Sequence, residues 1–177
     1  MIDAKDLKYY VIQPVLSAME PLWPGASNPA AVNLLLGTAF QESNVGGVTH
    51  LRQIGGGPGL GIYQIETATH DDIWETYLGT RPEKASFVRG LASQNMREDR
   101  PFHDDLISNL RYQTVIARIK YWRRKFKWPM LVHPGTKKLV IDPGNIEELG
   151  KIWKKHYNTH KGKGKVEEFV ASYPTII

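Results

Sequence analysis

A long apolar segment that follows Asn28-Pro29 constrains the fold more than any other part of the chain. It runs to Glu42 and places apolar side chains on nearly all sides of a helix: Ala30, Ala31, Val32, Leu34, Leu35, Leu36, Ala39 and Phe40. Asn28 is a typical helix-capping residue, and proline suits the first helical position. Because a helix that is apolar all round belongs in a protein interior, we expect a buried helix that ends at Glu42.

The rest of the chain predicts a mainly α fold. Apolar residues at helical spacing predict further helices over about 6–19, 69–78, 82–91, 105–128, 146–157 and 166–173. The helix that starts near residue 105 is expected to be the longest. Pro14 weakens the prediction of the first of these helices, because proline disrupts the interior of a helix. Thr69 would cap the second, with Asp71 and Asp72 as favourable negative charges in its first turn. Seven glycines indicate an irregular or short-hairpin segment between Glu42 and Gln64, and a short strand is expected at 138–141.

Composition bounds the class of protein. A chain of 177 residues with 41% hydrophobic residues suits one domain over 1–177 and has no apolar run near the roughly 20 residues that cross a bilayer. The first residues show no signal-peptide pattern. There is no cysteine, which excludes disulfides and cysteine metal sites. The net charge of +5 favours polyanionic partners, namely nucleic acid, acidic membranes or anionic wall polymers.

Glu42 is the first candidate catalytic residue. A carboxyl group on the last turn of so apolar a helix is partly desolvated, which raises its pKa and keeps it protonated near neutral pH. A general acid that acts on a glycosidic oxygen needs this property. The alternative is a solvated glutamate without function, although a carboxylate at a helix C-terminus opposes the helix dipole.

The segment from Gly59 to Glu66 is the second candidate. Gly59 and Gly61 allow the backbone to approach a ligand closely, and the Gln64 amide suits a sugar hydroxyl or N-acetyl group. Taken alone, the segment equally fits a glycine-rich turn that enters a helix. Glu66 is either a second carboxylate or a negative charge near a helix start.

Two other sets of residues carry weaker signals. No two of the histidines stand at ligand spacing with an acidic partner, so we expect neither a metal site nor a cofactor; these are His50, His70, His103, His133, His156 and His160. The aromatic and basic run from Tyr121 to Trp128 could bind nucleic acid by stacking and phosphate contact. More often such a run is the end of an amphipathic helix, so nucleic acid is not the favoured partner.

Together these residues resemble the lysozyme superfamily, closest to the branch of soluble lytic transglycosylases and goose-type lysozymes. Glu42-Ser43 resembles the Glu-Ser motif at the end of a buried helix, and 61–65 (Gly-Ile-Tyr-Gln-Ile) resembles the family's Gly-Leu-Met-Gln-Ile. Tyr157-Asn158 is similar to the family's Ala-Tyr-Asn motif, with His156 in place of the alanine. The segment 55–58 is richer in glycine than the matching segment of the bacterial enzymes, so the resemblance does not define the shape of the cleft floor.

The resemblance implies a lysozyme-like fold and roles for individual residues. Glu42 would act first as catalytic acid and then as base, and Tyr157 would hydrogen-bond near it and help to set its ionisation. Glu66 lies where goose-type lysozymes carry an aspartate that positions a water, whereas the transglycosylases need no second carboxylate. The residues expected to bind substrate are Ser43, Gly61, Tyr63, Gln64 and Asn158.

The implied activity is cleavage of the β-1,4 bond between N-acetylmuramic acid and N-acetylglucosamine in peptidoglycan. The likeness points to a phage virion or lysis protein that acts in the bacterial cell wall, after residence in a virion or in the host cytoplasm. Two alternatives stay open. One is a virion structural or adaptor protein with a lysozyme-like fold, other virion proteins as partners and little activity. The other is a nucleic-acid-binding module.

Overall fold

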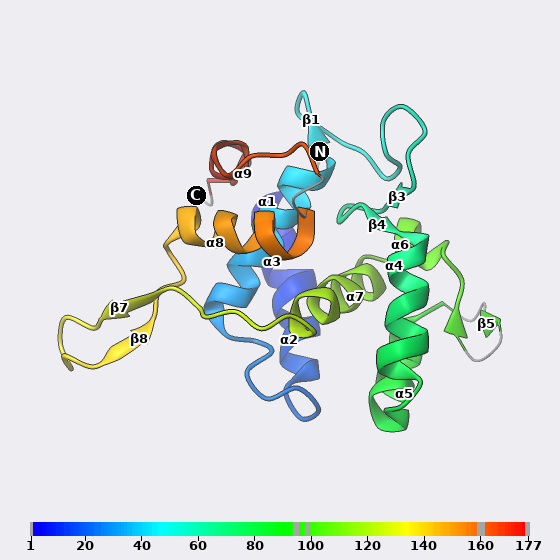
Figure 1. Ribbon diagram of the computed structural model, residues 1–177, viewed down its shortest axis with the longest axis horizontal. Coiled ribbons are helices and arrows are strands. Elements are labelled where there is room, and N and C mark those ends of the chain that lie inside the picture. Colours follow the sequence, from blue (N-terminus) through cyan, green and yellow to red (C-terminus); the bar gives the residue numbers. More distant parts are fainter. Residues whose placement is uncertain (1, 94–95, 98–99, 159–161, 176–177) are drawn as a thin grey trace.

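The computed structural model of the chain describes residues 2–93, 96–97, 100–158 and 162–175, and this part is mainly helical, as the sequence predicts (Figure 1). The α-helices are α1 (Ala4–Asp6), α2 (Gln13–Met19), α3 (Pro29–Ser43), α4 (Thr67–Asp72), α5 (Pro82–Leu91), α6 (Asp105–Ser108), α7 (Leu110–Trp122), α8 (Ile146–Trp153) and α9 (Val166–Ser172). Three π-helical segments continue or join them, namely η1 (Leu7–Ile12), η2 (Ile73–Leu78) and η3 (Lys154–Asn158).

Short antiparallel strand pairs fill several of the connections. They are β1 (Asn44–Val45) with β2 (Val48–Thr49), β3 (Gly59–Leu60) with β4 (Ile65–Glu66), β5 (Met96–Arg97) with β6 (Arg100–Pro101), and β7 (Met130–Val132) with β8 (Leu139–Ile141). The first pair is the expected hairpin after Glu42, with Asn44 opposite Thr49. The expected strand near 138–141 is β8, and the β7–β8 hairpin projects from the body of the molecule (Figure 1).

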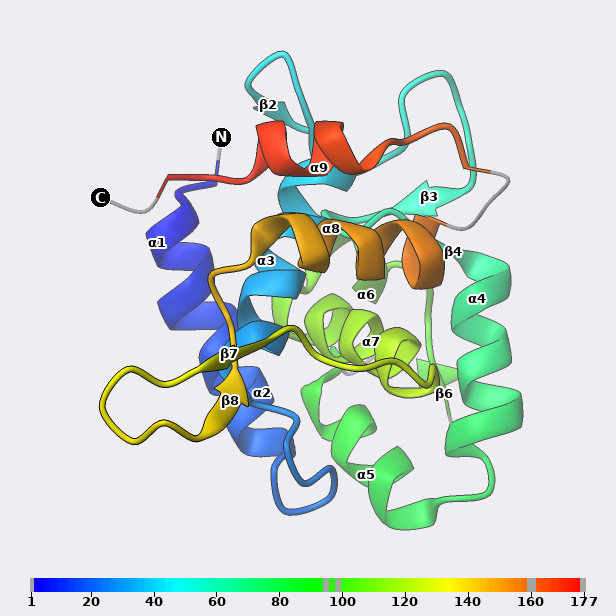
Figure 2. The same ribbon diagram turned by 60° about the vertical axis from the view of Figure 1, so that its left-hand side comes forward.

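Helix α3 is the centre of the core, as its apolar sequence predicts. Ten of its fifteen residues are buried, and the Asn28 side chain accepts the amide of Ala31 at 2.9 Å as an N-cap. Helices α7, α8 and α9 and segment η1 all contact it (Figure 2). Gly37 leaves the space that Phe169 of α9 fills, because a Cβ atom there would collide with that ring. The acid at the end of this helix therefore stands on a largely buried element of the fold.

The N-terminal helical segment shows what Pro14 does. The expected helix over 6–19 is present, but it passes from α1 through η1 into α2, which begins just before the proline. The Gln13 amide donates to the Lys8 carbonyl in the wider π-helical pattern. A proline has no amide hydrogen to donate, so the helix widens on its N-terminal side and does not end.

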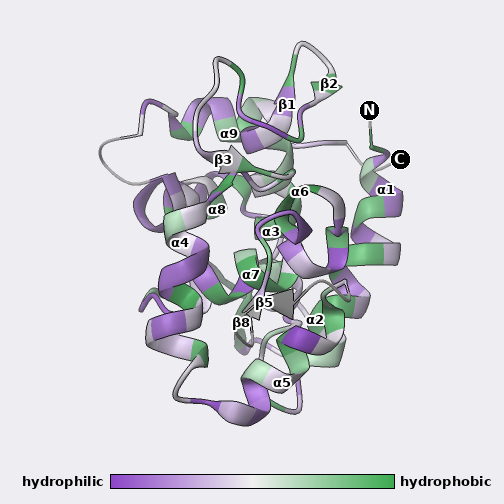
Figure 3. Ribbon diagram, turned by 90° about the vertical axis from the view of Figure 1, so that its right-hand side faces the viewer, coloured by the Kyte–Doolittle hydropathy of each residue, from purple (hydrophilic) through white to green (hydrophobic). Residues whose placement is uncertain are grey.

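Two helix boundaries differ from the prediction. The segment expected as one helix over 105–128 is divided at Asn109, which has an extended backbone. The Asn109 side chain accepts the amide of Tyr112 as the N-cap of α7, and α7 ends at Trp122. Helix α3, and not this segment, is the longest. Helix α4 starts at Thr67 after Glu66, so Thr69 does not cap it, and Asp71 and Asp72 lie at its end. Figure 3 shows hydrophilic and hydrophobic bands along α4, in which His70 is the buried residue.

Candidate active site

A polar cleft of about 730 Å³ opens beside the C-terminal end of α3. It gathers residues from α3, the β3–β4 connection, α4, the end of α7 and η3. Of the residues expected to form a site, five line this cleft: Glu42, Gln64, Glu66, Tyr157 and Asn158. Residues that are more than 110 positions apart in the chain thus meet at one surface.

Glu42 is held in a half-buried position at the edge of the cleft. The indole nitrogen of Trp153 on α8 donates a 2.7 Å hydrogen bond to its Oε1 atom. Burial raises the pKa of Glu42, and the Trp153 hydrogen bond and the positive charge of Lys120 oppose that rise. The raised pKa is the one that the sequence predicts for a carboxyl group on this helix.

Lys120 is a cleft residue that the sequence did not single out. It lies on the last turns of α7, and its Nζ atom is 3.4 Å from the centroid of the Tyr157 ring. Burial lowers the pKa of Lys120 to about 8, against the opposite influence of the negative charges on Glu42 and Glu66. A cation therefore stands within electrostatic reach of both carboxyl groups.

Gln64 occupies an unusual backbone conformation at the cleft. Its φ of 44° lies in the left-handed region, where non-glycine residues are uncommon and strained. Its side-chain Nε2 atom donates to the carbonyl oxygen of Gly61 at 2.7 Å. The amide is thus fixed by its own turn, with the glutamine at the cleft wall.

Tyr157 lies in the cleft, but its hydroxyl does not bind Glu42. It donates to the carbonyl oxygen of Tyr63 at 2.8 Å, so the expected hydrogen bond that influences Glu42 comes from Trp153 instead. Asn158 follows in η3, and its Oδ1 atom accepts from Lys154 at 2.9 Å. Tyr157 therefore fastens η3 to the turn before Gln64.

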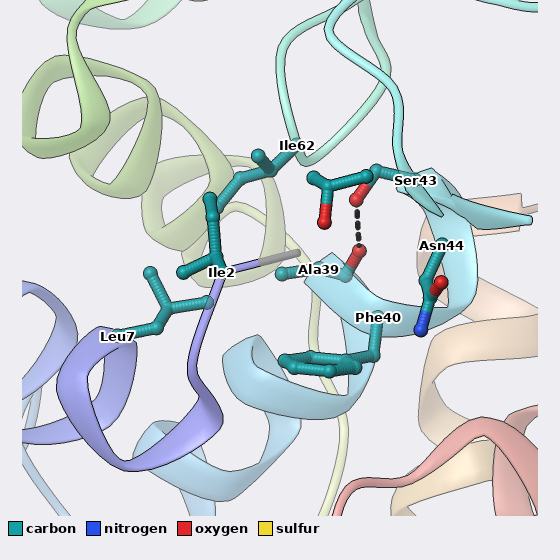
Figure 4. A pocket seen from close by; sticks show the side chains of 8 residues that line it. Ile2, Leu7, Ala39, Phe40, Ser43, Asn44 and Ile62 are labelled. Carbon is teal, nitrogen blue, oxygen red and sulfur yellow. Dashed lines mark hydrogen bonds between the residues drawn. The ribbon is translucent and has the colours of Figure 1, made fainter. Parts of the chain in front are cut away.

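Ser43 is not a cleft residue, in contrast to the expectation. Its side chain is buried, its hydroxyl donates to the Ala39 carbonyl oxygen at 2.7 Å, and it lines a separate pocket of about 10 Å³ among mainly apolar residues such as Ile2 and Phe40 (Figure 4). The physical reason is helical geometry, since consecutive residues of a helix point about 100° apart.

Gly61 and Tyr63, whose backbone was expected to hold the sugar, are not among the residues that line the cleft. Gly61 is buried with a φ of 70°, and a Cβ atom there would collide with the carbonyl oxygen of Leu106. The Tyr63 side chain is fully buried, and its hydroxyl is 3.2 Å from that of Thr114. Both residues shape the turn over 61–64, in which Gln64 alone is partly exposed while its neighbours are buried.

The aromatic and basic run from Tyr121 to Trp128 does not form an exposed stacking surface along its length. Tyr121 is fully buried, with its hydroxyl 2.8 Å from that of Thr38. Trp122 and Trp128 lie 5.0 and 5.9 Å from the buried guanidinium of Arg118. These rings are packed around a cation of the protein itself, which leaves Arg123 and Arg124 to line the cleft.

Two histidines meet an aspartate outside the cleft, although their spacing in the sequence suggested no such group. His70 and Asp71 on α4 lie next to His103, and their ligand atoms are all within 4.8 Å of one another. The pair His70 and His103 is separated by more than thirty residues, so only the fold brings it together. His160 lies outside the described residues.

Comparison with protein-family models, with curated proteins and with solved structures finds no match for this chain. In the described ranges, no helix has the length and apolar character to cross a membrane. Any assignment of function therefore rests on the geometry of the cleft and on the motif likenesses described above.

Proposed function

We propose that the protein is a glycosidase that cleaves the β-1,4 bond between N-acetylmuramic acid and N-acetylglucosamine in peptidoglycan, with Glu42 as its acid. The observation that carries the proposal is the setting of Glu42: a carboxyl group of raised pKa, bound by Trp153, at the edge of a polar cleft. A lysozyme-like fold is part of the proposal, on the likeness of the segments 42–43 and 61–65.

The cleft residues suit each step of such a reaction. Protonated Glu42 gives its proton to the glycosidic oxygen as the bond to the anomeric carbon breaks. The carboxylate that remains is stabilised by the Trp153 N–H group and by the charge of Lys120. Glu42 then accepts a proton from the attacking hydroxyl, which belongs either to water or to C6 of the same muramyl residue.

The role of Glu66 would distinguish between these two nucleophiles. It lines the same cleft at the end of β4 and is exposed, so a role in holding a water is open to it. We favour the route with a single carboxylate, which forms an anhydro ring, because Tyr157-Asn158 resembles the third transglycosylase motif. The variant E66A is then expected to keep most of its activity and to release anhydro-muramyl ends. A loss as deep as that of E42Q, with an unchanged melting temperature, would establish a hydrolase.

The decisive experiment is mass analysis of the muropeptides that purified protein releases from sacculi. Anhydro-muramyl ends support transglycosylation, and reducing ends support hydrolysis; E42Q is the matched inactive control. Absence of both products with wild-type protein would overturn the proposal. A stable complex with other virion proteins would then favour the structural or adaptor role, as expected for a phage origin.

A further inference from the structure

Asp71 bridges two histidines on the side of α4 that does not line the cleft. Its Oδ1 atom is 3.1 Å from Nδ1 of His70 and 2.8 Å from Nε2 of His103. The neighbours Thr69 and Asp72 line the cleft, so this cluster is separate from the proposed active site. The His70 side chain is fully buried, whereas Asp71 and His103 are 30% and 41% exposed.

The Nε2 atom of His70 is held by a hydrogen bond on the side of the ring away from Asp71. That atom is 2.6 Å from the hydroxyl of Tyr112, and the indole nitrogen of Trp74 donates to the same hydroxyl at 2.9 Å. Tyr112 is itself fully buried. Histidines that bind metals are usually oriented in this way, because a partner at one ring nitrogen fixes the direction of the other.

The distances match a compact set of metal ligands. Four tetrahedral ligand atoms at about 2.0–2.1 Å from a zinc ion lie about 3.4 Å from one another. The three ligand atoms here are all within 4.8 Å, and the two separations from Asp71 Oδ1, 3.1 and 2.8 Å, are shorter than 3.4 Å, so the ligand atoms would move apart by a few tenths of an ångström to admit the ion. His103 and Asp71 are both partly exposed, so a water molecule could supply a further ligand from the solvent side.

We propose that His70, Asp71 and His103 form a binding site for a divalent transition-metal ion, for which zinc is the expected occupant. Two imidazoles and one carboxylate are a ligand set that zinc accepts readily, whereas calcium and magnesium prefer oxygen ligands alone. The bound ion would join α4 to the segment before α6, two parts of the chain that are separated by η2, α5 and the β5–β6 pair. Its role is to fasten this part of the fold.

The test is isothermal titration calorimetry of zinc chloride into the full-length protein after removal of metals with a chelator. We expect saturation at one equivalent, and a loss of affinity of at least about 100-fold in H103A and in D71N, because each loses a ligand. The control is H133A, which removes an exposed histidine from the β7–β8 turn. It should bind zinc as the wild type does.

Two results would overturn the site. One is wild-type protein that takes up no zinc, in which case Asp71 is only the acceptor of a hydrogen-bond chain from Trp74 through Tyr112 and His70. The other is tight binding that H103A and D71N leave unchanged. Circular dichroism shows whether the variants are folded. Should they unfold, an anomalous difference map of zinc-soaked wild-type crystals decides, since a peak elsewhere, or none, contradicts the proposal.

Discussion

Glu42 and Ser43 are neighbours on the last turn of α3, yet they face two regions that differ in volume and in the polarity of their walls. Glu42 meets a cleft of about 730 Å³ with charged and amide side chains, and Ser43 meets a pocket of about 10 Å³ with mainly apolar walls. A rotation of about 100° separates the two directions. The contrast teaches that a pair of residues can match a motif together while only one of them is placed to meet a substrate.

The strongest test of this contrast is E42Q. Glutamine keeps the shape and an oxygen that can accept from Trp153, but it has no proton to give. The rate of release of muropeptides should fall by at least about 100-fold, the usual scale for loss of a general acid. The melting temperature should stay nearly unchanged, as measured by calorimetry. Clearance of sacculi at the wild-type rate would remove Glu42 from the mechanism.

A smaller effect is expected at Gln64, which lines the same cleft. In Q64A the amide that we expect to bind the sugar is absent, while the acid remains. The KM for chito-oligosaccharides should rise by about 10-fold, as for loss of one or two hydrogen bonds, with a smaller change in kcat. A crystal soak that places the sugar chain away from Gln64 would contradict this role.

The charge of Lys120 provides a test by pH. Its positive charge lowers the pKa of Glu42, so the neutral side chain in K120M should raise that pKa. Because Glu42 must be protonated to act, the alkaline limb of kcat/KM should move to higher pH by about one unit. The control K151M changes a lysine whose partners are Glu147 and Glu148 on α8. A limb that moves to lower pH, or not at all, would show that Lys120 does not influence the acid.

The smallest effect belongs to the other side of α3. S43A removes a buried hydroxyl whose bond to the Ala39 carbonyl lies within its own helix. We expect a loss of at most about 1 kcal/mol in the free energy of unfolding and activity within a factor of about 2 of the wild type. Chemical denaturation and the muropeptide assay measure the two quantities. A tenfold drop in activity without loss of stability would return Ser43 to the substrate-binding residues.

The sequence predicts the parts of this fold that depend on local signals. Asn28-Pro29 locates the start of α3, and its unbroken apolar run predicts its burial. Helix α5 begins and ends where its pattern predicts, over Pro82–Leu91. The raised pKa of Glu42 is confirmed for the same reason, because burial of that helix is readable from its own residues.

What the sequence could not reveal depends on contacts between distant segments. Trp153 is 111 residues from Glu42, and no spacing rule connects them. The approach of Lys120 to Tyr157 depends on how α7 crosses η3. The break at Asn109 had a local signal that outranks the apolar period, since asparagine is a favoured N-cap residue. The inward direction of Tyr63 follows from the turn, where Gln64 takes a left-handed conformation.

The π-helical register of η3 has a consequence for insertions and deletions. A π-helical turn accommodates one more residue than an α-helical turn, so everything beyond it is rotated by about 100° relative to an uninterrupted α-helix. Tyr157 and Asn158 reach the cleft in that rotated frame. Deletion of one residue at Lys154 or Lys155 would therefore restore the ordinary winding and keep the tyrosine directed at the cleft, whereas insertion of one more residue there would turn it aside. At this place the count of residues matters as much as their identity.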